Sequence, residues 1–509
     1  MAITSLLLSP PACVAYALLA VLYPYFVTYG PLREIPGPWS ARLSNLWLMR
    51  TARLGKRYLL VDEAHKKYGP VVRIQPNHVS VNDDEAIQLV YGHGNGFLKS
   101  EFYDTFISIQ RGLFNTRSRA EHTRKRKIVS HTFSAKSISE FEPFVHSNLE
   151  LFAAQWDRIC DAAPFGGYAS INCLDWFNYL AFDVIGDLAF GASFGMLSAG
   201  ADMAEVRDSP DSPPIYAPAV EILNRRGEVS ACLGCLPQLK PWARWLPDPF
   251  FSKGLNAVSN LAGIAIARVR RRFDVTDGAD SERKDLLARL MEGRDEKGEP
   301  LGREELTAEA LTQLIAGSDT TSNTSCALLY HAARTPGVLE TLREELDAAV
   351  PPGVVAPTYD VVKDLPYLQA VVNETLRYHS TSGIGLPRVV PPGSAGVEFR
   401  GHYFPAGTTL SVPTYSVHHS RDIWGDDADE FRPSRWGNVT ERQRNAFIPF
   451  SHGPRSCIGR NVADMELKLI VATWVRRYDV ILQQGEMETR EGFLRKPLGL
   501  RIGLKRREI

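Results

Sequence analysis

The sequence predicts one large, mostly α-helical domain with small β-sheets, placed behind an N-terminal membrane-anchor helix. Three observations lead to this fold class. Residues 84–350 have mostly helical patterns, short β-type runs lie before and after them, and residues 1–32 contain no charged side chain. With 509 residues and 44% hydrophobic content, the chain is long enough to bury a sizeable core.

Charge and cysteine content argue against a nucleic-acid-binding protein and against a protein built on a disulfide framework. Lys+Arg and Asp+Glu balance at 58 each, so no net charge favours nucleic-acid binding. The seven cysteines are scattered and odd in number, which argues against a disulfide framework and fits a reducing compartment. Cys232 and Cys235 have the spacing of a zinc or redox pair, but no second pair follows them. A pair of ordinary loop cysteines is therefore the favoured interpretation.

The first predicted element is a membrane-spanning helix within residues 1–32. The apolar run that begins at Ala12 allows roughly 17–20 helical residues, just enough to cross the hydrocarbon core. A cleaved signal peptide is the alternative, but neither a basic start nor a small-residue cleavage site is evident. Residues 33–57 are rich in arginine, so the positive-inside rule leaves the rest of the chain cytosolic. We expect an anchor at 1–32, a proline-containing basic linker at 33–57 and a globular domain at 58–509.

The later elements follow from periodicity and turn residues. Pro76 and Asn77 separate two β-type runs, which predicts a hairpin. Surface loops are expected at 208–218 and 274–280. Helices are expected at 58–68, 139–160, 174–190, 255–272, 284–291 and 307–334, and strands at 71–74, 78–81, 397–400, 409–413 and 500–504.

The stretch from Phe450 to Gly459 carries the strongest chemical signal. Cys457 lies in a short loop between Gly453 and Gly459, and glycines let a backbone turn sharply and lie against a flat ring. Phe450 is placed to shield the sulfur from water, and Arg455 presents a fork of donors to an anionic cofactor edge. The alternative is a structural cysteine in a Gly/Pro-rich loop.

The longest predicted helix, 307–334, has a centre that disfavours helix formation. Thr307 is its expected N-cap, and residues 317–325 are rich in glycine and short polar side chains, which compete for backbone hydrogen bonds. Broken local rules often mark function. A local distortion near Thr320 would open a groove where its hydroxyl holds a water or oxygen ligand, with Asp319 passing protons. Close packing on a neighbouring helix is the alternative.

Two further patterns are weak alone. Glu374 and Arg377 lie three residues apart on one helix face, a pairing that is common on protein surfaces. The basic run from His122 to Lys127 is equally well explained as a solvated helix face.

Residues 450–459 match F-x-x-G-x-R-x-C-x-G at every fixed position, and this pattern resembles the haem-binding loop of cytochrome P450 enzymes. Residues 316–321 are similar to the oxygen-activating helix motif of the same family. The resemblance implies the cytochrome P450 fold and a haem b (iron protoporphyrin IX) whose iron is held by Cys457. It also implies that Asp319 and Thr320 form the acid–alcohol pair of a catalytic domain.

The resemblance gives the weaker patterns a role. Glu374, Arg377 and Arg435 match the family's E-x-x-R motif and its partner arginine, which implies a network that locks the loop leading to the cysteine. Ser434 stands where the family usually has Glu, a departure that does not touch this network. The residues that the resemblance places in contact with haem are His122, Arg126, Arg388, Phe450, Arg455, Cys457 and Gly459.

Over nearly its whole length the chain is similar to the fungal benzoate para-hydroxylases. This implies a single-pass enzyme of the endoplasmic reticulum that uses O₂ to convert benzoate to 4-hydroxybenzoate. Electrons would come from NADPH through a separate NADPH–cytochrome P450 reductase, since the sequence has no flavin domain or G-x-G-x-x-G unit. A patch formed by the basic run with Arg442, Arg444 and Arg460 is the expected reductase docking surface. The likeness lies in residues 91–100, 111–117, 316–326 and 489–499.

The substrate pocket should be small and mostly apolar, with one polar end for a carboxylate. Lys99 or Arg111 is the expected carboxylate partner, with Ser or Thr hydroxyls as the alternative. Other candidate wall residues are Gly317, Thr381 and Leu386, within expected walls at 97–110, 311–320, 381–386 and 492–498.

Other functions compete with benzoate hydroxylation. The substrate of a monooxygenase can be another small aromatic or a phenylpropanoid-type compound. A haem-thiolate isomerase that works without O₂ needs no proton delivery, so the presence of both Asp319 and Thr320 argues against it. A haem sensor without turnover is disfavoured by the same groove helix and by the anchor.

Overall fold

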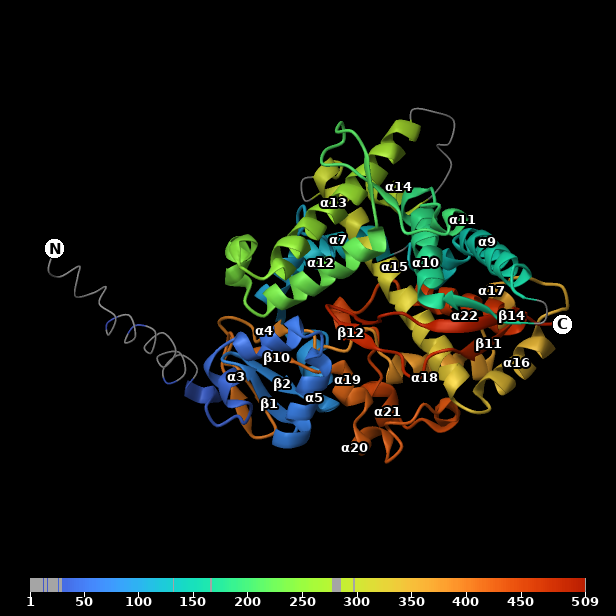
Figure 1. Cartoon of the computed structure of the whole chain (residues 1–509). Helices are drawn as coiled ribbons and strands as arrows, with labels where there is room; N and C mark the ends of the chain where they lie inside the picture. The colour runs from blue at the N-terminus through green and yellow to red at the C-terminus, as the bar shows by residue number, and fades with distance from the viewer. Residues whose placement is uncertain are drawn as a thin grey trace.

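The computed structural model describes residues 30–508 apart from 131, 165–166, 277–284 and 296–297, together with residues 12, 16 and 26. The described chain is mostly helical, and its short strands form small sheets (Figure 1). The anchor expected at 1–32 lies almost entirely outside the described residues. Among the helices that are described, none combines the length and apolar character that a bilayer span requires.

The largest sheet joins strands of the first hundred residues to two strands between residues 388 and 411, in the order β1-β2-β10-β7-β3. The expected hairpin at Pro76 and Asn77 is present, with Val71 opposite Val81. In the same sheet β3 pairs with β7, which sets Lys99 directly opposite Arg388. The bounds are β1 Val71–Gln75, β2 His78–Val81, β3 Leu98–Lys99, β7 Arg388–Val389 and β10 Thr409–Ser411.

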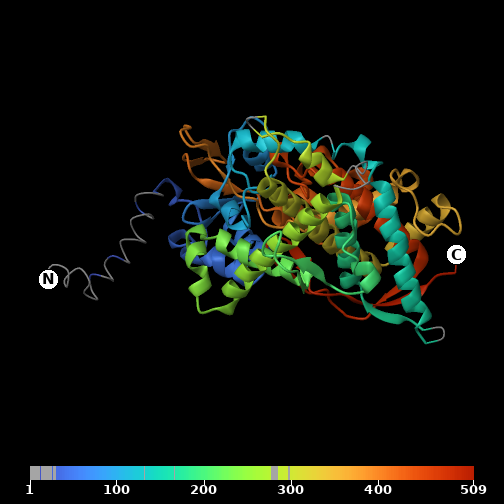
Figure 2. The same ribbon diagram turned by 90° about the horizontal axis from the view of Figure 1, so that it is seen from above.

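The helical body is built around α15, which crosses the middle of the molecule between α10, α13, α18 and α22 (Figure 1). Seen from above, the C-terminus lies at the opposite end of the molecule from α3 and α4 (Figure 2). The bounds of these and the other long helices are α9 Glu142–Asp161, α10 Cys173–Phe190, α12 Ala219–Gly234, α13 Pro249–Thr276, α15 Arg303–Arg334, α18 Pro366–Tyr378 and α22 Arg460–Arg477.

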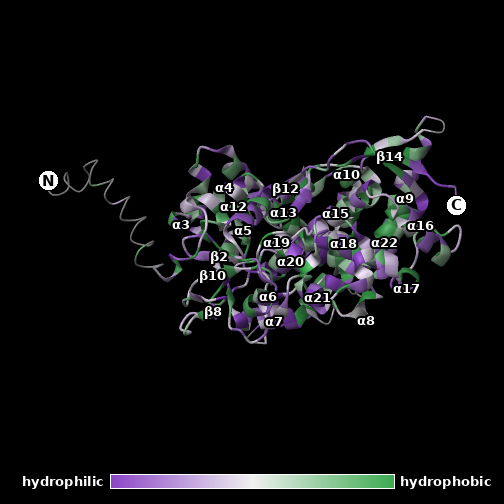
Figure 3. Cartoon of the chain, turned by 90° about the horizontal axis from the view of Figure 1, so that it is seen from below, coloured by the Kyte–Doolittle hydropathy of each residue, from purple (hydrophilic) through white to green (hydrophobic). Residues whose placement is uncertain are grey.

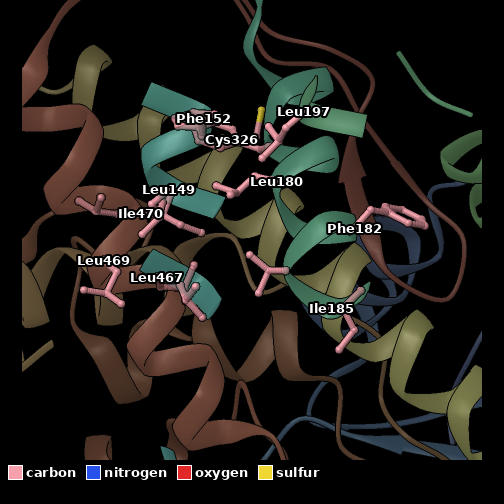
Figure 4. Close-up of a cluster of buried hydrophobic side chains, with 14 of the residues drawn as sticks. Leu149, Phe152, Leu180, Phe182, Ile185, Leu197, Cys326, Leu467, Leu469 and Ile470 are labelled. Atoms are coloured by element: carbon pink, nitrogen blue, oxygen red, sulfur yellow. The ribbon is translucent and has the colours of Figure 1, made fainter. Parts of the chain in front are cut away.

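The main core forms where α9, α10, α15 and α22 meet. Leu180 and Ile185 of α10 lie among side chains from the other three helices, including Phe152 and Cys326 (Figure 4). Burying side chains of this size contributes about 1.5–3 kcal/mol each. Hydrophobic and hydrophilic segments alternate along most other elements, as expected for amphipathic helices that cover a core (Figure 3).

The remaining elements surround this core. β4 pairs with β14, which pairs with β11, and three two-stranded sheets join β12 to β13, β5 to β6 and β8 to β9. The strands are β4 Ala169–Asn172, β5 Ala204–Val206, β6 Ile215–Ala217, β8 Val397–Phe399, β9 His402–Phe404, β11 Tyr478–Leu482, β12 Thr489–Glu491, β13 Arg495–Pro497 and β14 Arg501–Arg506. The shorter helices are α3 Trp39–Leu43, α4 Leu46–Arg53, α5 Arg57–Tyr68, α6 Glu85–Tyr91, α7 Arg119–Ser130, α8 Ala135–Ile138, α11 Met196–Ala199, α14 Leu286–Met291, α16 Val338–Ala349, α17 Tyr359–Val362, α19 Thr414–His418, α20 Arg421–Trp424 and α21 Glu441–Ala446. The 3₁₀ turns are η2 Gly30–Leu32, η3 Glu101–Phe106, η4 Pro237–Trp245, η5 Pro433–Asn438 and η6 Gly453–Arg455.

The structure corrects two expectations about α15. The helix begins at Arg303, one turn before the expected N-cap Thr307, because Glu304 and Glu305 in its first turn complement the helix dipole. Thr307 instead donates to the Arg303 carbonyl at 2.7 Å. The expected distortion at Thr320 is not found, and α15 runs unbroken to Arg334.

The expectations about loops were partly correct. Residues 208–214 form the expected surface loop, but 215–217 form β6, which pairs with β5 in a hairpin. Of the loop expected at 274–280, residues 274–276 belong to α13 and residues 277–280 lie outside the described residues. Cys232 lies in the last turn of α12 and Cys235 is its C-cap, so the pair is not in a loop. Both thiols are free and buried, and burial raises their pKa values to about 12 and about 11.

Candidate functional site

The loop that carries Cys457 connects η6 to the start of α22. The Cys457 amide donates to the Phe450 carbonyl at 2.9 Å, which closes the loop. Gly453 has a φ of 69°, and a Cβ there would lie 1.9 Å from the Tyr91 carbonyl oxygen. Only glycine allows the loop to press against the end of α6 in this conformation. The backbone of the loop is therefore held against the end of α6.

The Cys457 side chain combines accessible surface with a position deep among protein atoms. It has exposed surface, yet protein atoms surround it so closely that burial raises the pKa of its thiol. A hydrogen bond from the Gly459 amide and the charges of Arg126 and Arg460 oppose this shift and favour the thiolate. A Cβ on Gly459 would meet nothing within 4 Å. An accessible sulfur beside open space fits the flat haem that the sequence predicts.

A cluster of basic side chains lies around the same loop, and we call it the cationic cradle; four members are lysine or arginine, and the fifth, His122, is neutral. Its members come from β3, α7, β7 and the cysteine loop. Burial, followed by the charges of the other four, lowers the pKa of His122 to about 3. The five residues are Lys99, His122, Arg126, Arg388 and Arg455.

In the described part of the chain, no carboxylate forms an ion pair with any member of the cradle. Arg126 donates to the Ser456 carbonyl at 2.9 Å, Arg388 to the Tyr103 hydroxyl at 2.7 Å and Arg455 to the Thr116 carbonyl at 2.7 Å. Arginines that repel one another and donate only to neutral oxygens fit a dianionic partner. The two propionates of haem are such a partner.

The two expected carboxylate partners of the substrate are both engaged elsewhere. Lys99 donates to the Phe114 carbonyl and lies over the rings of Tyr103 and Phe114, with Nζ 4.3 and 4.5 Å from their centroids. It belongs to the cradle. Arg111 is bound to Asp104 at 2.5 Å, and a second arginine, Arg117, shares that carboxylate at 2.8 Å.

The middle of α15 brings together Asp319, Thr320 and an accessible Ala316. The Thr320 hydroxyl donates to the Ala316 carbonyl at 2.6 Å, and the Asp319 carboxylate accepts from Asn323 at 2.8 Å. Burial raises the pKa of Asp319, against the opposing charges of Lys496 and Arg226. The environment of Asp319 therefore favours the protonated form of its carboxyl group more than water does.

The other candidate wall residues have structural partners. A Cβ on Gly317 would lie 2.5 Å from Cδ1 of Ile185, so this glycine permits close packing of α15 on α10. The Thr381 carbonyl accepts from the Arg495 amide at 2.7 Å. The Leu386 carbonyl accepts from the Tyr91 hydroxyl at 3.0 Å.

The structure brings Glu374, Arg377 and Arg435 together in a buried network. Arg377 donates to both oxygens of Glu374 at 2.7 and 2.9 Å, and Arg435 donates to Oε1 at 2.9 Å. The indole N–H of Trp436 also donates to Oε2 of Glu374 at 3.0 Å. These bonds tie α18 to the segment that leads toward the cysteine loop.

The basic run of α7 is only partly on the surface. Lys125 is buried and binds Glu305 at 2.5 Å and Glu309 at 2.9 Å, and Arg124 also binds Glu305. Of the residues expected to extend the docking patch, Arg442 is paired with Asp84 and Asp422, while Arg444 and Arg460 are exposed. The free positive patch is therefore smaller than the sequence predicts.

Three buried ionisable residues were not anticipated. Burial raises the pKa of Glu466 to about 7 and that of Glu491 to about 8, and lowers the pKa of Arg226 to about 10. For Arg226, the helical periodicity of the sequence could have revealed this burial. Arg226 follows Ile222 by four residues on the buried face of α12, where a charge is unexpected.

Comparisons with known proteins agree with this geometry. The family model described as Cytochrome P450 matches residues 35–503. The chain is 60% identical to a protein of Aspergillus niger named Benzoate 4-monooxygenase, with 99% of each chain covered. It is 31% identical to a Pisatin demethylase of Fusarium vanettenii, over 94% of this chain and 89% of the other. It is 30% identical to a cytochrome P450 monooxygenase of Penicillium aethiopicum, over 97% and 98%. The chain therefore belongs to the cytochrome P450 family and is a haem-dependent monooxygenase that receives its electrons from a redox partner.

Proposed function

We propose that this monooxygenase hydroxylates benzoate at the para position to give 4-hydroxybenzoate. The observation that carries the proposal is the 60% identity, over 99% of both chains, to a protein named Benzoate 4-monooxygenase. The electrons come from NADPH through an NADPH–cytochrome P450 reductase. The described structure supports the substrate class through an aromatic cluster that packs on α12.

In this proposal Cys457 would hold the haem iron through its sulfur, and the cationic cradle would hold the propionates. When bound through a thiolate, haem activates O₂ for insertion of one oxygen atom into a C–H bond. The amide of Gly459 and the charges of Arg126 and Arg460 stabilise the thiolate form of Cys457. Phe450 lies at the edge of the main core and limits access of water to the loop.

Asp319 and Thr320 supply the protons that oxygen activation consumes. The Thr320 hydroxyl is held on α15 by the Ala316 carbonyl and keeps its lone pairs free to accept a further hydrogen bond. Asp319, one residue earlier, is held by Asn323 and has a raised pKa because of burial. An acid with this shift gives up and regains a proton more readily near neutral pH than an ordinary aspartate does.

The substrate ring has a suitable apolar site. Phe106, Phe114 and Phe493 pack in T-shaped contacts with centroid distances between 5.0 and 5.8 Å, and Phe102 joins them. These residues come from three separate segments of the chain. A benzene ring packs favourably on the edges and faces of such a cluster.

The membrane and reductase contacts remain part of the proposal. Residues 1–32 anchor the chain in the endoplasmic reticulum membrane, residues 33–57 link the anchor to the body, and residues 58–509 form the cytosolic catalytic domain. Arg444 and Arg460 are exposed near the cysteine loop and offer positive charge to an acidic reductase surface.

Three measurements on the full-length protein test the proposal. The reduced holoenzyme with CO should show the red-shifted Soret band of a thiolate-bound haem. Benzoate should shift the oxidised haem from low to high spin, and the system reconstituted with reductase and NADPH should release 4-hydroxybenzoate. A normal CO spectrum without benzoate binding or turnover would reject the substrate alone and favour another small aromatic compound.

A further inference from the structure

Arg226 is a buried cation without a carboxylate partner among the described residues. Its side chain projects from the middle of α12, and the residue is 5% exposed. Its Nη2 donates to the Phe106 carbonyl at 2.9 Å, and its Cζ lies 5.1 Å from the centroid of the Phe106 ring. The Nε atom is buried and has no hydrogen-bond partner. Leaving a charged donor unsatisfied in the interior is unfavourable, so this position calls for an acceptor.

The charges around Arg226 do not satisfy it. Asp319 attracts it across the gap between α12 and α15, but no ion pair joins the two. Lys240, from η4, is a second cation close enough to interact, and it donates to the carbonyls of Asp104 and Ile107 at 3.3 and 3.1 Å. Apolar groups and backbone carbonyls therefore make up most of the surroundings of Arg226. Its guanidinium still has N–H groups that can donate hydrogen bonds to one anion.

Arg226 lies between the two parts of the proposed reaction site. On one side its partner Phe106 belongs to the aromatic cluster, with Phe493 at 5.0 Å. On the other side is Asp319, next to Thr320. The backbone of α12 also packs on the turn between β12 and β13 that supplies Phe493, since a Cβ on Gly492 would lie 2.9 Å from the Glu228 amide nitrogen.

We propose that Arg226 binds the carboxylate of the substrate and thereby selects small aromatic acids. The proposal rests on the proposed function and adds a specificity residue to it. The unpartnered Nε and the adjacent Nη2 form a fork that can donate two hydrogen bonds to one carboxylate. Lys99 and Arg111 are less suited, because the first belongs to the cationic cradle and the second is paired with Asp104.

This assignment also accounts for the position of hydroxylation. The para carbon is the ring atom farthest from the carboxyl group. A carboxylate held at Arg226 fixes one end of the molecule at α12, while the aromatic cluster sets the plane of the ring. The opposite end of the ring is then the part that is free to meet the reacting centre.

Binding of a charged and a neutral ligand to purified holoenzyme tests the assignment. Equilibrium dialysis should show that Arg226→Met weakens benzoate binding by roughly 10- to 100-fold, the usual effect of losing hydrogen bonds to a charged group. Binding of benzamide, which has the same shape without the charge, should change less than about threefold. The matched control is Arg225→Met, because Arg225 is half-exposed on the same helix and paired with Glu221, and it should alter neither ligand.

A second variant protects the test against misfolding and against a purely structural role. Arg226→Gln keeps a donor for the Phe106 carbonyl without the charge and should show the same selective loss. Arg226→Glu should bind benzamidine, a cation of the same shape, better than the wild type does. Equal losses for benzoate and benzamide, or unchanged benzoate binding in either neutral variant, would overturn the assignment.

The outcomes separate this inference from the proposed function. If the wild type neither binds nor hydroxylates benzoate, the proposed function fails. If the wild type forms 4-hydroxybenzoate and Arg226→Met binds benzoate normally but turns over every substrate more slowly, Arg226 acts on Asp319 instead, and only the carboxylate assignment is lost.

Discussion

Glu374 and Arg377 form a two-bond ion pair in which both side chains are completely buried. Arg377 further donates to the carbonyls of His418, Ala428 and Glu430 at 2.7 to 2.9 Å. One guanidinium thus joins α18 to two other backbone segments, at residue 418 and at residues 428–430, and the carboxylate fixes its orientation. The ion pair has a structural role, because it holds in place the chain that leads to the cysteine loop.

Arg377→Lys should destabilise the protein, because a lysine ammonium cannot reproduce the planar fork of bonds. Breaking a buried pair by removing one partner costs about 3–5 kcal/mol. We expect the variant to lose haem as well as stability. Thermal unfolding and the amplitude of the CO-difference band measure both effects.

Removing an exposed ion pair is the control for Arg377. Lys363 and Asp360 lie 2.7 Å apart on the surface, with Asp360 85% exposed. Lys363→Ala should change the free energy of unfolding by less than about 1 kcal/mol. A similar loss in both variants would mean that burial of the Glu374 pair has no special role.

Gly453→Ala tests whether the cysteine loop is shaped by its contact with α6. The added Cβ would collide with the Tyr91 carbonyl, and the residue would also occupy a left-handed conformation. We expect a loss of at least about 2 kcal/mol and poor haem retention. Gly437→Ala, where a Cβ meets nothing within 4 Å, should leave both properties unchanged. Full haem content in Gly453→Ala would contradict this account of the loop.

Local patterns predicted much of this molecule, and long-range contacts explain what they missed. The hairpin at Pro76 and Asn77 and the helix α10 follow from turn residues and periodicity within one segment. The pairing of β4 with β14 joins residues more than 300 positions apart, and neither strand's own sequence specifies its partner.

The same distinction holds at the candidate site. The positions of Cys457 and Thr320 were read from motifs in which all the chemistry lies within a few residues. The sequence shows the charge of Lys99 and so suggests a role at the substrate, but it does not show which residues lie next to Lys99. Only the sheet pairing with Arg388 shows that it belongs to the cationic cradle. The sequence does not reveal a role for Arg226, because the function of a charge on the apolar face of a helix depends on which elements pack against that face.

Lys99→Met should have opposite effects on the protein with and without haem. Burial and the neighbouring charges of Arg388 and Arg455 lower the pKa of Lys99, so the charged lysine is unfavourable there when no anion is bound. The apoprotein should gain stability, while haem should dissociate faster because one cation facing the propionates is lost. Haem transfer to an acceptor protein and thermal unfolding of the apoprotein measure these changes. Weaker benzoate binding at full haem occupancy would instead restore Lys99 as a substrate residue.

Glu491 predicts a dependence of stability on pH. Its Oε2 accepts from the Tyr58 amide at 2.8 Å and its Oε1 has no partner, and burial raises its pKa from 4.5 to about 8 despite Arg57 and Arg495. Between these two values the folded protein keeps a proton that the unfolded chain has lost. The free energy of unfolding should therefore fall as the pH rises from 4.5 to 8, by at most about 1.4 kcal/mol per pH unit, and level off above.

Glu491→Gln should remove this part of the pH dependence, because glutamine keeps the acceptor for Tyr58 and does not titrate. Chemical denaturation of both proteins between pH 5 and 9 gives the difference directly. The surface substitution Glu488→Gln is the matched control. Parallel curves for the wild type and Glu491→Gln would show that Glu491 is already ionised in the folded protein.

Asp319→Asn and Thr320→Ala should affect turnover in different ways. Asparagine preserves the contact with Asn323 but cannot exchange a proton, so the rate should fall by about 100-fold. Alanine at Thr320 removes the hydroxyl that positions the proton donor, so NADPH should still be consumed while less product forms. Product formed per NADPH oxidised, together with the solvent isotope effect on turnover, distinguishes the two. Thr324→Ala is the control, because that hydroxyl makes the same kind of bond one turn further along α15, to the Thr320 carbonyl at 2.8 Å. If Thr324→Ala uncoupled the reaction as strongly as Thr320→Ala, the effect would come from the helix backbone and not from the Thr320 hydroxyl.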